Sequence, residues 1–370
     1  MENRKYKILA INPGSTSTKI AVFLNEQILF RKTIDYTMSK LSGMEVPEQY
    51  SFRKQDILFE LEKAKIKLKN IDVFVGRGGG QVPLKSGTYE INEKLLEHGR
   101  IGIGGGNHPA QLAAQICDSL RNEYGGRAFV VNPPDVDEFD EIARITGIKD
   151  VYRASRIHAL NQKEVAHRFC LVVNKNYKKI NLIIVHVGGG ISITAHREGR
   201  MIDSNDILQG DGPMTPTRCG SIAVGQIIDL CYSGKYTKKY MKDKTTTTGG
   251  FVDLLGTADM KAVEQRIQRG DSYAKLMFDA MIYQIGKSIG SCAVVLKGNV
   301  YKIILTGSMV KSEYLVKTLK EYTEWIAPSY IMAGEFEMEA LAAGALRVLM
   351  KKDEPIEYTG IPVWSGVNKK

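Results

Sequence analysis

The chain has 370 residues, of which 43% are hydrophobic and 25% are charged, and it carries a formal net charge of +10. This composition is ordinary for a globular protein, and the length favours two domains over one. The longest apolar stretches, such as NLIIVHV (181–187), are far shorter than the roughly 20 residues of a membrane-spanning helix. The basic N-terminal segment leads through a short apolar run into Asn-Pro-Gly, which is typical of a first strand and not of a signal peptide.

Charge and cysteine content restrict the function further. The lysine-rich stretches KAKIKLKN, NKNYKKIN and KYTKKYMKDK are typical of solvated helix faces and loop tips, which favours attraction of small anionic substrates over nucleic-acid binding. Five is an odd number of cysteines and no two have CxxC spacing, which argues against a disulfide scaffold and a zinc knuckle. We therefore expect a cytoplasmic protein with reduced cysteines at 117, 170, 219, 231 and 292, and with no membrane or nucleic-acid partner.

The first half of the chain predicts strands and helices around a glycine-rich turn. Apolar runs predict three successive strands, over 7–11, 20–24 and 28–36. Hydrophobic periodicity then predicts a lysine-rich helix over roughly 55–68, a strand over 71–80 that leads into GRGGG, a helix over 110–121 closed by Gly125-Gly126, and a strand over 127–132.

The second half repeats this order. Residues 180–204 predict a strand, a glycine turn, an alternating strand, a second turn and a short strand. Helices are expected over 221–232, 271–297 and 339–350, a buried strand over 300–308, and a loop at KTTTTGG (244–250). Because each half contains a three-strand meander with a glycine-rich first turn, the sequence predicts two related α/β domains. We expect residues 1–150 with 340–370 to form the first domain and residues 151–339 to form the second.

The stretch GSTSTK (14–19) is a candidate phosphate site. A P-loop has a second glycine before its lysine and a helix after it, whereas here no second glycine precedes Lys19 and the strand-like IAVF follows. The stretch therefore predicts a hairpin in which Gly14 permits a tight turn, hydroxyls and backbone amides donate to oxyanions, and Lys19 adds positive charge. The hydroxyls are those of Ser15, Thr16 and Ser17. An ordinary hairpin with polar turn residues is the alternative at this point.

Two further glycine turns strengthen the phosphate interpretation. HVGGGISI (186–193) occupies the corresponding hairpin position in the second half, and LTGS (305–308) ends another strand. A glycine bulge in a twisted sheet would also account for the first of these. Three such turns in two related halves nevertheless favour a shared ligand site.

Two arginines and two histidines flank these turns. Arg77 precedes three glycines and Arg218 lies in the proline-stiffened GPMTPTRCGS, so both are placed to bind an anion bidentately, although surface arginines commonly form ion pairs. His158 precedes a predicted helix and is either structural or catalytic, whereas His186 lies inside an apolar strand and is more typical of a core histidine. The sequence contains no HExxH motif and no Ser-His-Asp pattern, so it does not favour a hydrolase.

Taken together, these motifs resemble the acetate/butyrate kinase family of the acetate and sugar kinase–Hsp70–actin superfold. The resemblance runs from about residue 6 to 352 in the same order. It implies two duplicated actin-like (ribonuclease H-like) domains, each a mixed sheet with an N-terminal meander flanked by helices, with a nucleotide cleft between them and the C-terminal helix packed on the first domain. The stretches that carry it are ILAINPGSTSTKIAVF, VGRGGG, NHPAQLAAQI, RIHALNQK, HVGGGISITAHREGRMID, GDGPMTPTRCGS, YQIGKSIGSCAVVLKG and EALAAGALRVL.

The resemblance also implies a reaction and residue roles. The reaction is reversible, ATP-dependent phosphorylation of a short-chain carboxylate to an acyl phosphate, with magnesium, in a cytoplasmic homo-oligomer that serves fermentation. Arg77 and Arg218 resemble the arginines that hold the phosphoryl group and the carboxylate, and His158 resembles the histidine that supports the phosphoryl oxygens. Further residues match the first phosphate loop (Asn12, Gly14, Ser15, Thr16, Ser17, Lys19), the second phosphate loop (His186, Gly188, Gly189, Gly190), the adenosine-side motif (Thr306, Gly307, Ser308), the magnesium site (Glu337, Asn12) and an additional active-site histidine (His108).

Three positions depart from the family pattern. Asn132 stands where members usually have aspartate, and Ser308 follows Gly307 where they usually have a second glycine. If the aspartate orients magnesium or its waters, asparagine keeps an oxygen but loses a charge, so we expect weakened magnesium use. The region around Glu337 also differs, which leaves Glu335 and Glu339 as alternative metal-side carboxylates.

Alternatives to the expected butyrate or branched-acid acceptor are acetate and propionate. An Hsp70- or actin-like ATP switch would share the glycine turns but has little need for paired arginines. A weakened regulatory paralogue is a further alternative, motivated by Asn132 and Ser308.

Overall fold

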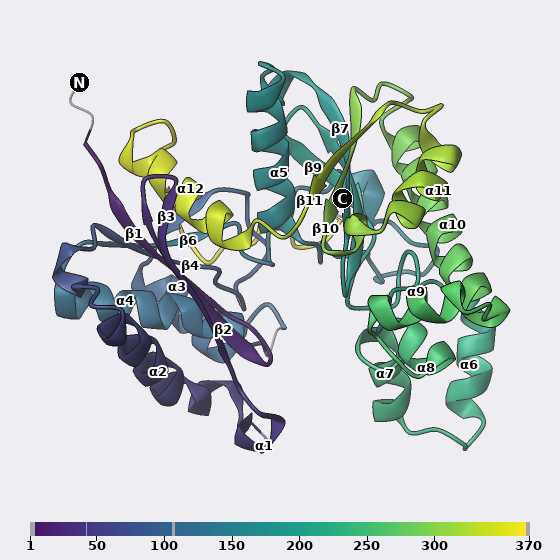
Figure 1. Cartoon of the computed structure of the whole chain (residues 1–370), viewed down its shortest axis with the longest axis horizontal. Helices are drawn as coiled ribbons and strands as arrows, with labels where there is room; N and C mark the ends of the chain where they lie inside the picture. The colour runs from purple at the N-terminus through teal and green to yellow at the C-terminus, as the bar shows by residue number, and fades with distance from the viewer. Residues whose placement is uncertain (1–3, 42, 106–107, 368–370) are drawn as a thin grey trace. The chain divides into compact units, whose positions relative to one another are not determined.

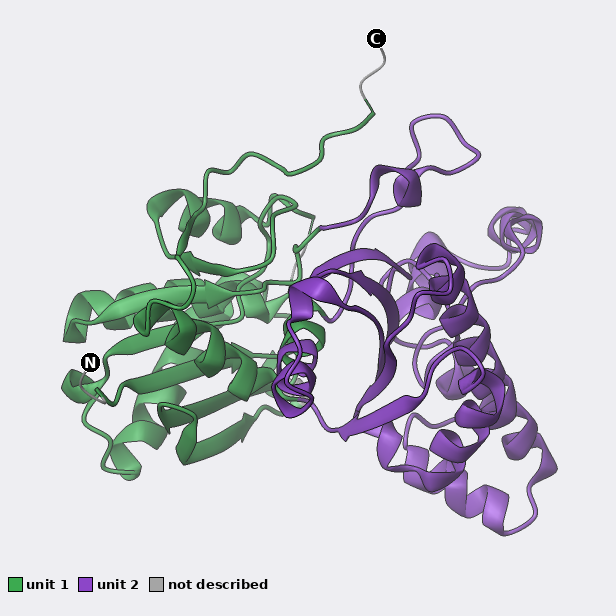
Figure 2. Ribbon diagram, turned by 90° about the horizontal axis from the view of Figure 1, so that it is seen from above, with its two compact units in different colours: residues 1–137, 159–164, 336–370 green, residues 138–158, 165–335 purple. Residues whose placement is uncertain are grey.

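The computed structural model describes residues 4–41, 43–105 and 108–367, and the chain divides into two compact units (Figure 2). Unit 1, drawn in green, contains residues 1–137, 159–164 and 336–370, and unit 2, drawn in purple, contains residues 138–158 and 165–335. The chain therefore passes between the units several times. The domain boundaries predicted from the sequence stay a prediction.

Unit 1 contains a seven-stranded mixed sheet with the strand order β12-β5-β6-β4-β1-β2-β3 (Figure 1). Strands β1, β2 and β3 pair antiparallel in sequence, whereas β4 is parallel to both β1 and β6. The β1–β2 ladder runs from Lys7 opposite Leu24 to Pro13 opposite Thr18, which confirms the predicted hairpin around Gly14. The strands are β1 (Lys7–Pro13), β2 (Ser17–Leu24), β3 (Gln27–Asp35), β4 (Val73–Gly76), β5 (Thr88–Glu90), β6 (Arg127–Val131) and β12 (Ile356–Glu357).

Helices cover both faces of this sheet. Ile8 and Ala10 of β1 join α12 in one buried cluster, whereas the alternate residues Leu9 and Ile11, also fully buried, face the side on which α4 packs. The helices are α1 (Met38–Leu41), α2 (Tyr50–Lys63), α3 (Glu93–Ile101), α4 (Leu112–Tyr124) and α12 (Glu337–Leu349), with short 3₁₀ helices η1 (Val46–Gln49), η2 (Leu68–Asn70) and η3 (Pro109–Gln111).

Unit 2 contains a five-stranded sheet with the order β11-β10-β7-β8-β9. Strands β7, β8 and β9 form an antiparallel meander, and β7 and β11 are both parallel to β10. This repeats the arrangement of unit 1, in which β1 continues into a meander on one side and pairs in parallel with β4 on the other. The strands are β7 (Asn181–Val187), β8 (Ile191–Arg197), β9 (Arg200–Ser204), β10 (Lys302–Gly307) and β11 (Ser329–Ala333).

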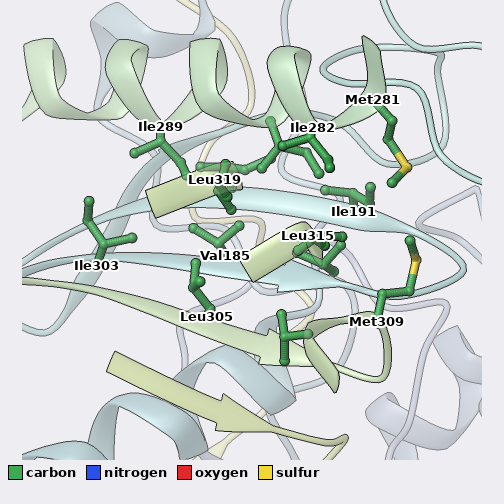
Figure 3. Close-up of a cluster of buried hydrophobic side chains, with 14 of the residues drawn as sticks. Val185, Ile191, Met281, Ile282, Ile289, Ile303, Leu305, Met309, Leu315 and Leu319 are labelled. Atoms are coloured by element: carbon green, nitrogen blue, oxygen red, sulfur yellow. The ribbon is translucent and has the colours of Figure 1, made fainter. Parts of the chain in front are cut away.

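The core of unit 2 lies between its sheet and two helices. Figure 3 shows Ile282 and Ile289 of α10 above Val185 of β7, with Leu315 and Leu319 of α11 in the same buried cluster. The helices that contribute to this unit are α5 (Ala159–Val172, shared with unit 1), α6 (Val224–Tyr232), α7 (Lys238–Thr246), α8 (Phe251–Leu255), α9 (Met260–Gln268), α10 (Ser272–Val295) and α11 (Glu313–Thr323), with 3₁₀ helices η4 (Glu141–Arg144), η5 (Tyr177–Lys179) and η6 (Met309–Lys311). None of the helices in the described part of the chain combines the length and apolar character needed to cross a membrane.

The strand expected over 71–80 is confined to β4, the helix expected over 221–232 begins at Val224, and two further predicted elements also differ from the structure. The helix expected over 55–68 begins at Tyr50, because a 3₁₀ turn with a capping box leads directly into it, and it ends at Lys63, because Lys65 has a left-handed φ of 57°. The loop expected at 244–250 is helical through Thr246, since Thr237 caps α7 by accepting a hydrogen bond from Tyr240 N.

Replacing Phe278 of α10 with alanine should lower the free energy of unfolding by about 3–5 kcal/mol, because the side chain is fully buried in the unit 2 core. Val294→Ala on the same helix is the control, since Val294 is 77% exposed and its truncation should change stability by less than about 0.5 kcal/mol. Urea denaturation followed by circular dichroism measures both. Equal losses in the two variants would contradict this assignment of the core.

Candidate functional site

In unit 1, a carboxylate contacts two polar residues from distant segments of the chain. Glu337, the first residue of α12, accepts a hydrogen bond from Asn12 Nδ2 (2.8 Å) and forms an ion pair with Arg77 Nη1 (3.2 Å). Asn12 is the second-last residue of β1 and Arg77 follows β4. Because these strands are parallel, their ends lie at the same edge of the sheet. The first turn of α12 is also favourable for negative charge. The structure thus brings together three residues that the sequence assigned separately.

Glu337 is distinguished from the two alternative carboxylates by its neighbours. Glu339 pairs with Arg31 of β3, and Glu335 belongs to unit 2, where it lies near Gly188. Of the three, Glu337 is therefore the carboxylate beside Asn12 and Arg77. The helix α12 begins at Glu337, two residues before the sequence-predicted start at 339, so Glu337 lies in its first turn.

The cluster around Glu337 contains polar atoms that the described residues leave unsatisfied. Asn12 Oδ1 and Arg77 Nε are buried and have no hydrogen-bond partner within the described parts of the chain. A buried oxygen acceptor beside a carboxylate suits a cation, and a buried guanidinium N–H suits an anion. No group of three or more His, Cys, Asp and Glu residues suited to a metal occurs in the described ranges, but Mg²⁺ keeps several waters and needs few protein ligands. Asn12 and Glu337 therefore fit a hydrated magnesium ion.

The three glycines after Arg77 all have positive φ, at 70°, 150° and 79° for Gly78, Gly79 and Gly80. A Cβ on Gly78 would lie 2.5 Å from Val130 Cγ1, and one on Gly80 would lie 2.5 Å from Gln111 Nε2. Both the backbone conformation and the close packing therefore require glycine. This rigid turn holds Arg77 at the end of β4, as the sequence predicted.

The tip of the β1–β2 hairpin contacts His108. Gly14 N donates to Ser17 O (2.7 Å), which closes the turn, and Ser15 Oγ lies 3.3 Å from His108 Nε2. His108 Nδ1 accepts a hydrogen bond from Ala110 N (3.1 Å), so in the neutral ring the proton is on Nε2, which donates to Ser15. On β2, Lys19 stands opposite Asn12 in the ladder. Asn107, the first residue of the motif that contains His108, lies outside the described residues.

Although part of His108 is exposed, its pKa is lowered to about 4. The main cause is loss of solvent around the ring, followed by the positive charges of Arg77 and Arg53, while Glu337 acts in the opposite direction. His108 is therefore a neutral hydrogen-bond donor at pH 7.

Asn132 has a clear structural contact. It follows β6 with a φ of 39°, and its Oδ1 accepts hydrogen bonds from Gly87 N (2.8 Å) and Ser86 Oγ (2.9 Å). After glycine, asparagine and aspartate are the residues that best tolerate this backbone region, and either offers the accepting oxygen. The side-chain oxygen thus stabilises the turn before β5.

In unit 2, two histidines stack at the end of β7. The rings of His158 and His186 lie 4.0 Å apart between centroids with an interplanar angle of 18°, and His158 Nδ1 lies 2.9 Å from Ser192 Oγ of β8. His186 lies on the same face of β7 as Leu182 and Ile184, opposite to Val185, because side chains alternate along a strand. His158, which directly precedes α5, stacks on it from that face. The sequence placed His186 in an apolar strand but did not predict this pairing.

Arg218 packs against the glycine turn between β7 and β8. A Cβ on Gly190 would lie 2.0 Å from Arg218 Nη1, so only glycine allows the guanidinium to take this place. Thr215 fixes both partners, because its hydroxyl donates to Gly189 O (2.9 Å) and accepts from Arg218 N (3.1 Å). Arg218 Nε and Nη1 are buried without a hydrogen-bond partner among the described residues. Burial lowers the pKa of Arg218 and Asp206 opposes that shift, yet an arginine side chain stays charged in proteins.

The third glycine turn ends β10 beside the second. Gly307 has a φ of 98°, and a Cβ there would lie 2.3 Å from Val187 O, whereas Ser308 has ordinary helical angles (φ −73°, ψ −31°). Glycine is thus required at 307 but not at 308, so the departure at Ser308 causes no backbone strain. Thr306 Oγ1 donates to Gly334 O (3.1 Å), which ties this turn to the end of β11.

Two supporting residues were missed at the level of sequence. Thr215 carries no signal beyond its place in a proline-rich loop. Arg53 does carry a signal in the sequence, which is its spacing of four residues from Ile57 and eight from Leu61. This spacing places an arginine on the buried face of α2, where a hydrophobic residue is expected. Its side chain is fully buried beneath the β1–β2 hairpin.

Comparison with known structures defines the class of fold. A crystal structure of acetate kinase from Porphyromonas gingivalis matches with a TM-score of 0.76 at 17% identity, covering 93% of this chain and 100% of that chain. A propionate kinase from Francisella tularensis subsp. tularensis SCHU S4 matches with a TM-score of 0.73 at 18% identity, covering 91% and 98%. The fold is therefore the actin-like α/β fold of the acetate kinases, as the sequence predicted.

Sequence comparison then identifies the family. Butyrate kinase 1 of Clostridium acetobutylicum is 41% identical over 354 residues, which cover 95% of this chain and 99% of that protein. Residues 149–321 match the acetokinase family. The chain belongs to the acetokinase family, which confirms the resemblance drawn from its motifs.

We expect His108 to stay neutral down to about pH 4, because desolvation and two arginines disfavour its charged form. Unfolding would restore an ordinary pKa of about 6.5, so the unfolded chain binds more protons and this group contributes a loss of stability as the pH falls from about 6.5 towards 4. Titration of histidine ring proton resonances by NMR, assigned with a His108→Gln variant, measures the pKa. A midpoint near 6.5 would contradict the described environment.

Proposed function

We propose that the protein is a carboxylate kinase that transfers the γ-phosphoryl group of ATP to a short-chain fatty acid, with butyrate or a branched short acid as the preferred acceptor. The observation that carries this proposal is Arg218, whose guanidinium packs against a glycine turn and has two buried nitrogens without a hydrogen-bond partner among the described residues. Such a group suits an anionic ligand. Near full-length identity to a butyrate kinase supports the same reaction.

The chemistry needs charge neutralisation more than acid–base catalysis. A carboxylate of pKa about 4.3 is already ionised at pH 7, so its oxygen attacks the γ-phosphorus without a general base. The new bond joins the carboxylate oxygen to phosphorus, the bond from the γ-phosphorus to the bridging oxygen breaks, and ADP leaves with that electron pair. No proton is transferred, and the reverse reaction forms ATP from the acyl phosphate. Stabilising charge on the transferring group is therefore the main task of the protein.

The residues of each unit suit part of this task. In unit 1 we assign the hairpin hydroxyls and amides of Ser15, Thr16 and Ser17, with Lys19, to the nucleotide phosphates, and Arg77 to the transferring group or the acceptor. His108, as a neutral donor on Ser15, supports the hairpin tip.

In unit 2 we assign Arg218 to the second anionic partner and His158 to the phosphoryl oxygens. The glycine turn that contains Gly188 to Gly190 contributes backbone amides, and Thr306 to Ser308 lie on the adenosine side. The stack on His186 and the contact with Ser192 hold the His158 ring in one orientation. These roles rest on the chemistry of the side chains and on the family motifs.

Magnesium belongs to this proposal. Asn12 and Glu337 would hold the ion, which when bound supplies positive charge to the phosphate oxygens. The ion pair with Arg77 and the hydrogen bond from Asn12 orient the Glu337 carboxylate. We assign to Asn132 an effect on magnesium use through the turn that it stabilises.

The proposal also includes a homo-oligomer, a dimer or a multiple of dimers, in the cytoplasm of a fermenting cell. Exposed apolar residues on α6 support self-association, since Val224, Ile228 and Tyr232 are 69%, 51% and 87% exposed. All five cysteines are free thiols, which suits a reducing compartment.

With ATP, magnesium and hydroxylamine, the enzyme should form hydroxamates from a panel of C2 to C6 carboxylates, with the highest kcat/KM for butyrate or a branched acid. Higher values for acetate or propionate would change the acceptor, and no hydroxamate from any acid would refute the carboxylate-kinase proposal.

Arg218→Lys should lower kcat by about 10²–10³-fold, because lysine cannot reproduce the guanidinium fork. Arg266→Lys is the control, because Arg266 lies in the same unit and forms an ion pair with Asp271. This variant should keep the parental kcat.

Asn132→Asp should lower the magnesium concentration for half-maximal rate several-fold, because a carboxylate adds charge while keeping the accepting oxygen for Gly87 and Ser86. Rates measured against magnesium at saturating ATP test this, with thermal unfolding as a check on folding. If neither the magnesium dependence nor kcat changes, Asn132 has only its structural contact.

A further inference from the structure

We propose that Arg53 is a positioning residue for nucleotide binding, which shapes the β1–β2 hairpin from beneath without touching the ligand. This inference rests on the proposed function of the hairpin as a phosphate site. It concerns a residue on α2 that none of the motifs contains.

Arg53 bridges both ends of the hairpin turn. Its Nη2 donates to Gly14 O (3.0 Å), and its Nη1 donates to Ser17 O (3.1 Å) and to Thr18 Oγ1 (2.8 Å). The remaining donors reach Gln49 Oε1, from Nε at 3.0 Å and from Nη2 at 2.9 Å. One planar group thus links residues 14, 17 and 18 to α2.

This contact sets the direction of the hairpin amides. In a trans peptide the carbonyl and the following N–H point in opposite directions. Because the carbonyl of Gly14 points down to Arg53, the N–H of Ser15 points away from it, to the side where the proposal places phosphate. The Gly14 N to Ser17 O hydrogen bond (2.7 Å) keeps the turn closed around this arrangement.

The charge of Arg53 is buried, and no carboxylate of the described residues accepts a hydrogen bond from it. The residue has no exposed surface, and within the described ranges its hydrogen bonds go to carbonyl, hydroxyl and amide oxygens and not to a carboxylate. Asp56, the acidic residue that acts on it electrostatically, pairs with Lys40 (3.1 Å). A cation under the turn favours an anion above it.

Aromatic rings hold the guanidinium in place. Its carbon lies 4.6 Å from the centroid of Tyr36 and 5.9 Å from that of Phe52. Tyr36 is itself tied to the hairpin, since its N donates to Thr16 O (2.8 Å) and its hydroxyl donates to Thr18 Oγ1 (3.2 Å). Lysine has a single ammonium on a flexible stem, so it cannot bridge the same acceptors in one fixed plane.

The experiment measures ATP and ADP binding by calorimetry for the parent, Arg53→Lys and Arg53→Met, and the KM of the carboxylate for each. Both variants should raise the Kd of nucleotide at least tenfold and leave the carboxylate KM within twofold. Lys54→Met is the matched control, because Lys54 is the next residue on α2 and pairs with Glu123 (3.2 Å), so its nucleotide Kd should stay within twofold. A folded Arg53→Met variant with a parental Kd, or with an equal rise in both constants, overturns the inference.

Two milder variants keep the test decisive if Arg53→Met does not fold. Thr18→Val and Gln49→Leu each remove one acceptor of Arg53 and should raise the nucleotide Kd several-fold, and parental values in both overturn the inference. Binding is measured without turnover, so a parent that binds ATP but forms no hydroxamate refutes the carboxylate acceptor and still tests Arg53. A parent that binds no nucleotide refutes both.

Discussion

Parallel pairing of β1 with β4 in unit 1, and of β7 with β10 in unit 2, is the constraint on which the cluster of candidate residues in each unit depends. Parallel strands end at the same edge of a sheet, so Asn12 and Arg77 meet in unit 1, and the turns after His186 and Thr306 meet in unit 2. The antiparallel partner in each unit, β2 or β8, adds a hairpin at that edge. One arrangement of strands, used twice, therefore collects polar residues from distant parts of the chain.

Glycine and arginine have complementary roles at these edges. Glycine removes side-chain volume where another group must come close, as at Gly190, where Arg218 takes the space of a Cβ. Arginine supplies a planar cation with several donors, either facing a ligand, as proposed for Arg218, or turned inward to hold backbone carbonyls, as with Arg53. In the proposed function, hairpins and arginines bind the anion, where a P-loop uses the end of a helix.

Much of the fold follows from local pattern. Alternating apolar residues and glycine turns predicted β1, β2, β7, β8 and β10 closely, because both are properties of short stretches. The ends of α2 were not predicted well, since a 3₁₀ turn before it and a left-handed Lys65 after it decide where the helix runs. Among candidate residues, Arg77 stood out before three glycines and Arg218 in a proline-stiffened loop. The contacts of Arg53 could not be predicted, because its partners are 35 or more residues away in sequence apart from Gln49.

The sequence by itself determined the hairpin character of GSTSTK, since the missing second glycine and the following strand residues exclude a P-loop. It also determined the family, because many motifs occur in one order. Only the tertiary structure decided which carboxylate joins Asn12 and Arg77, that His158 and His186 stack, and that Ser308 causes no strain. These outcomes depend on strand pairing and on where α12 begins, and contacts between residues far apart in sequence leave no trace in any single stretch of it.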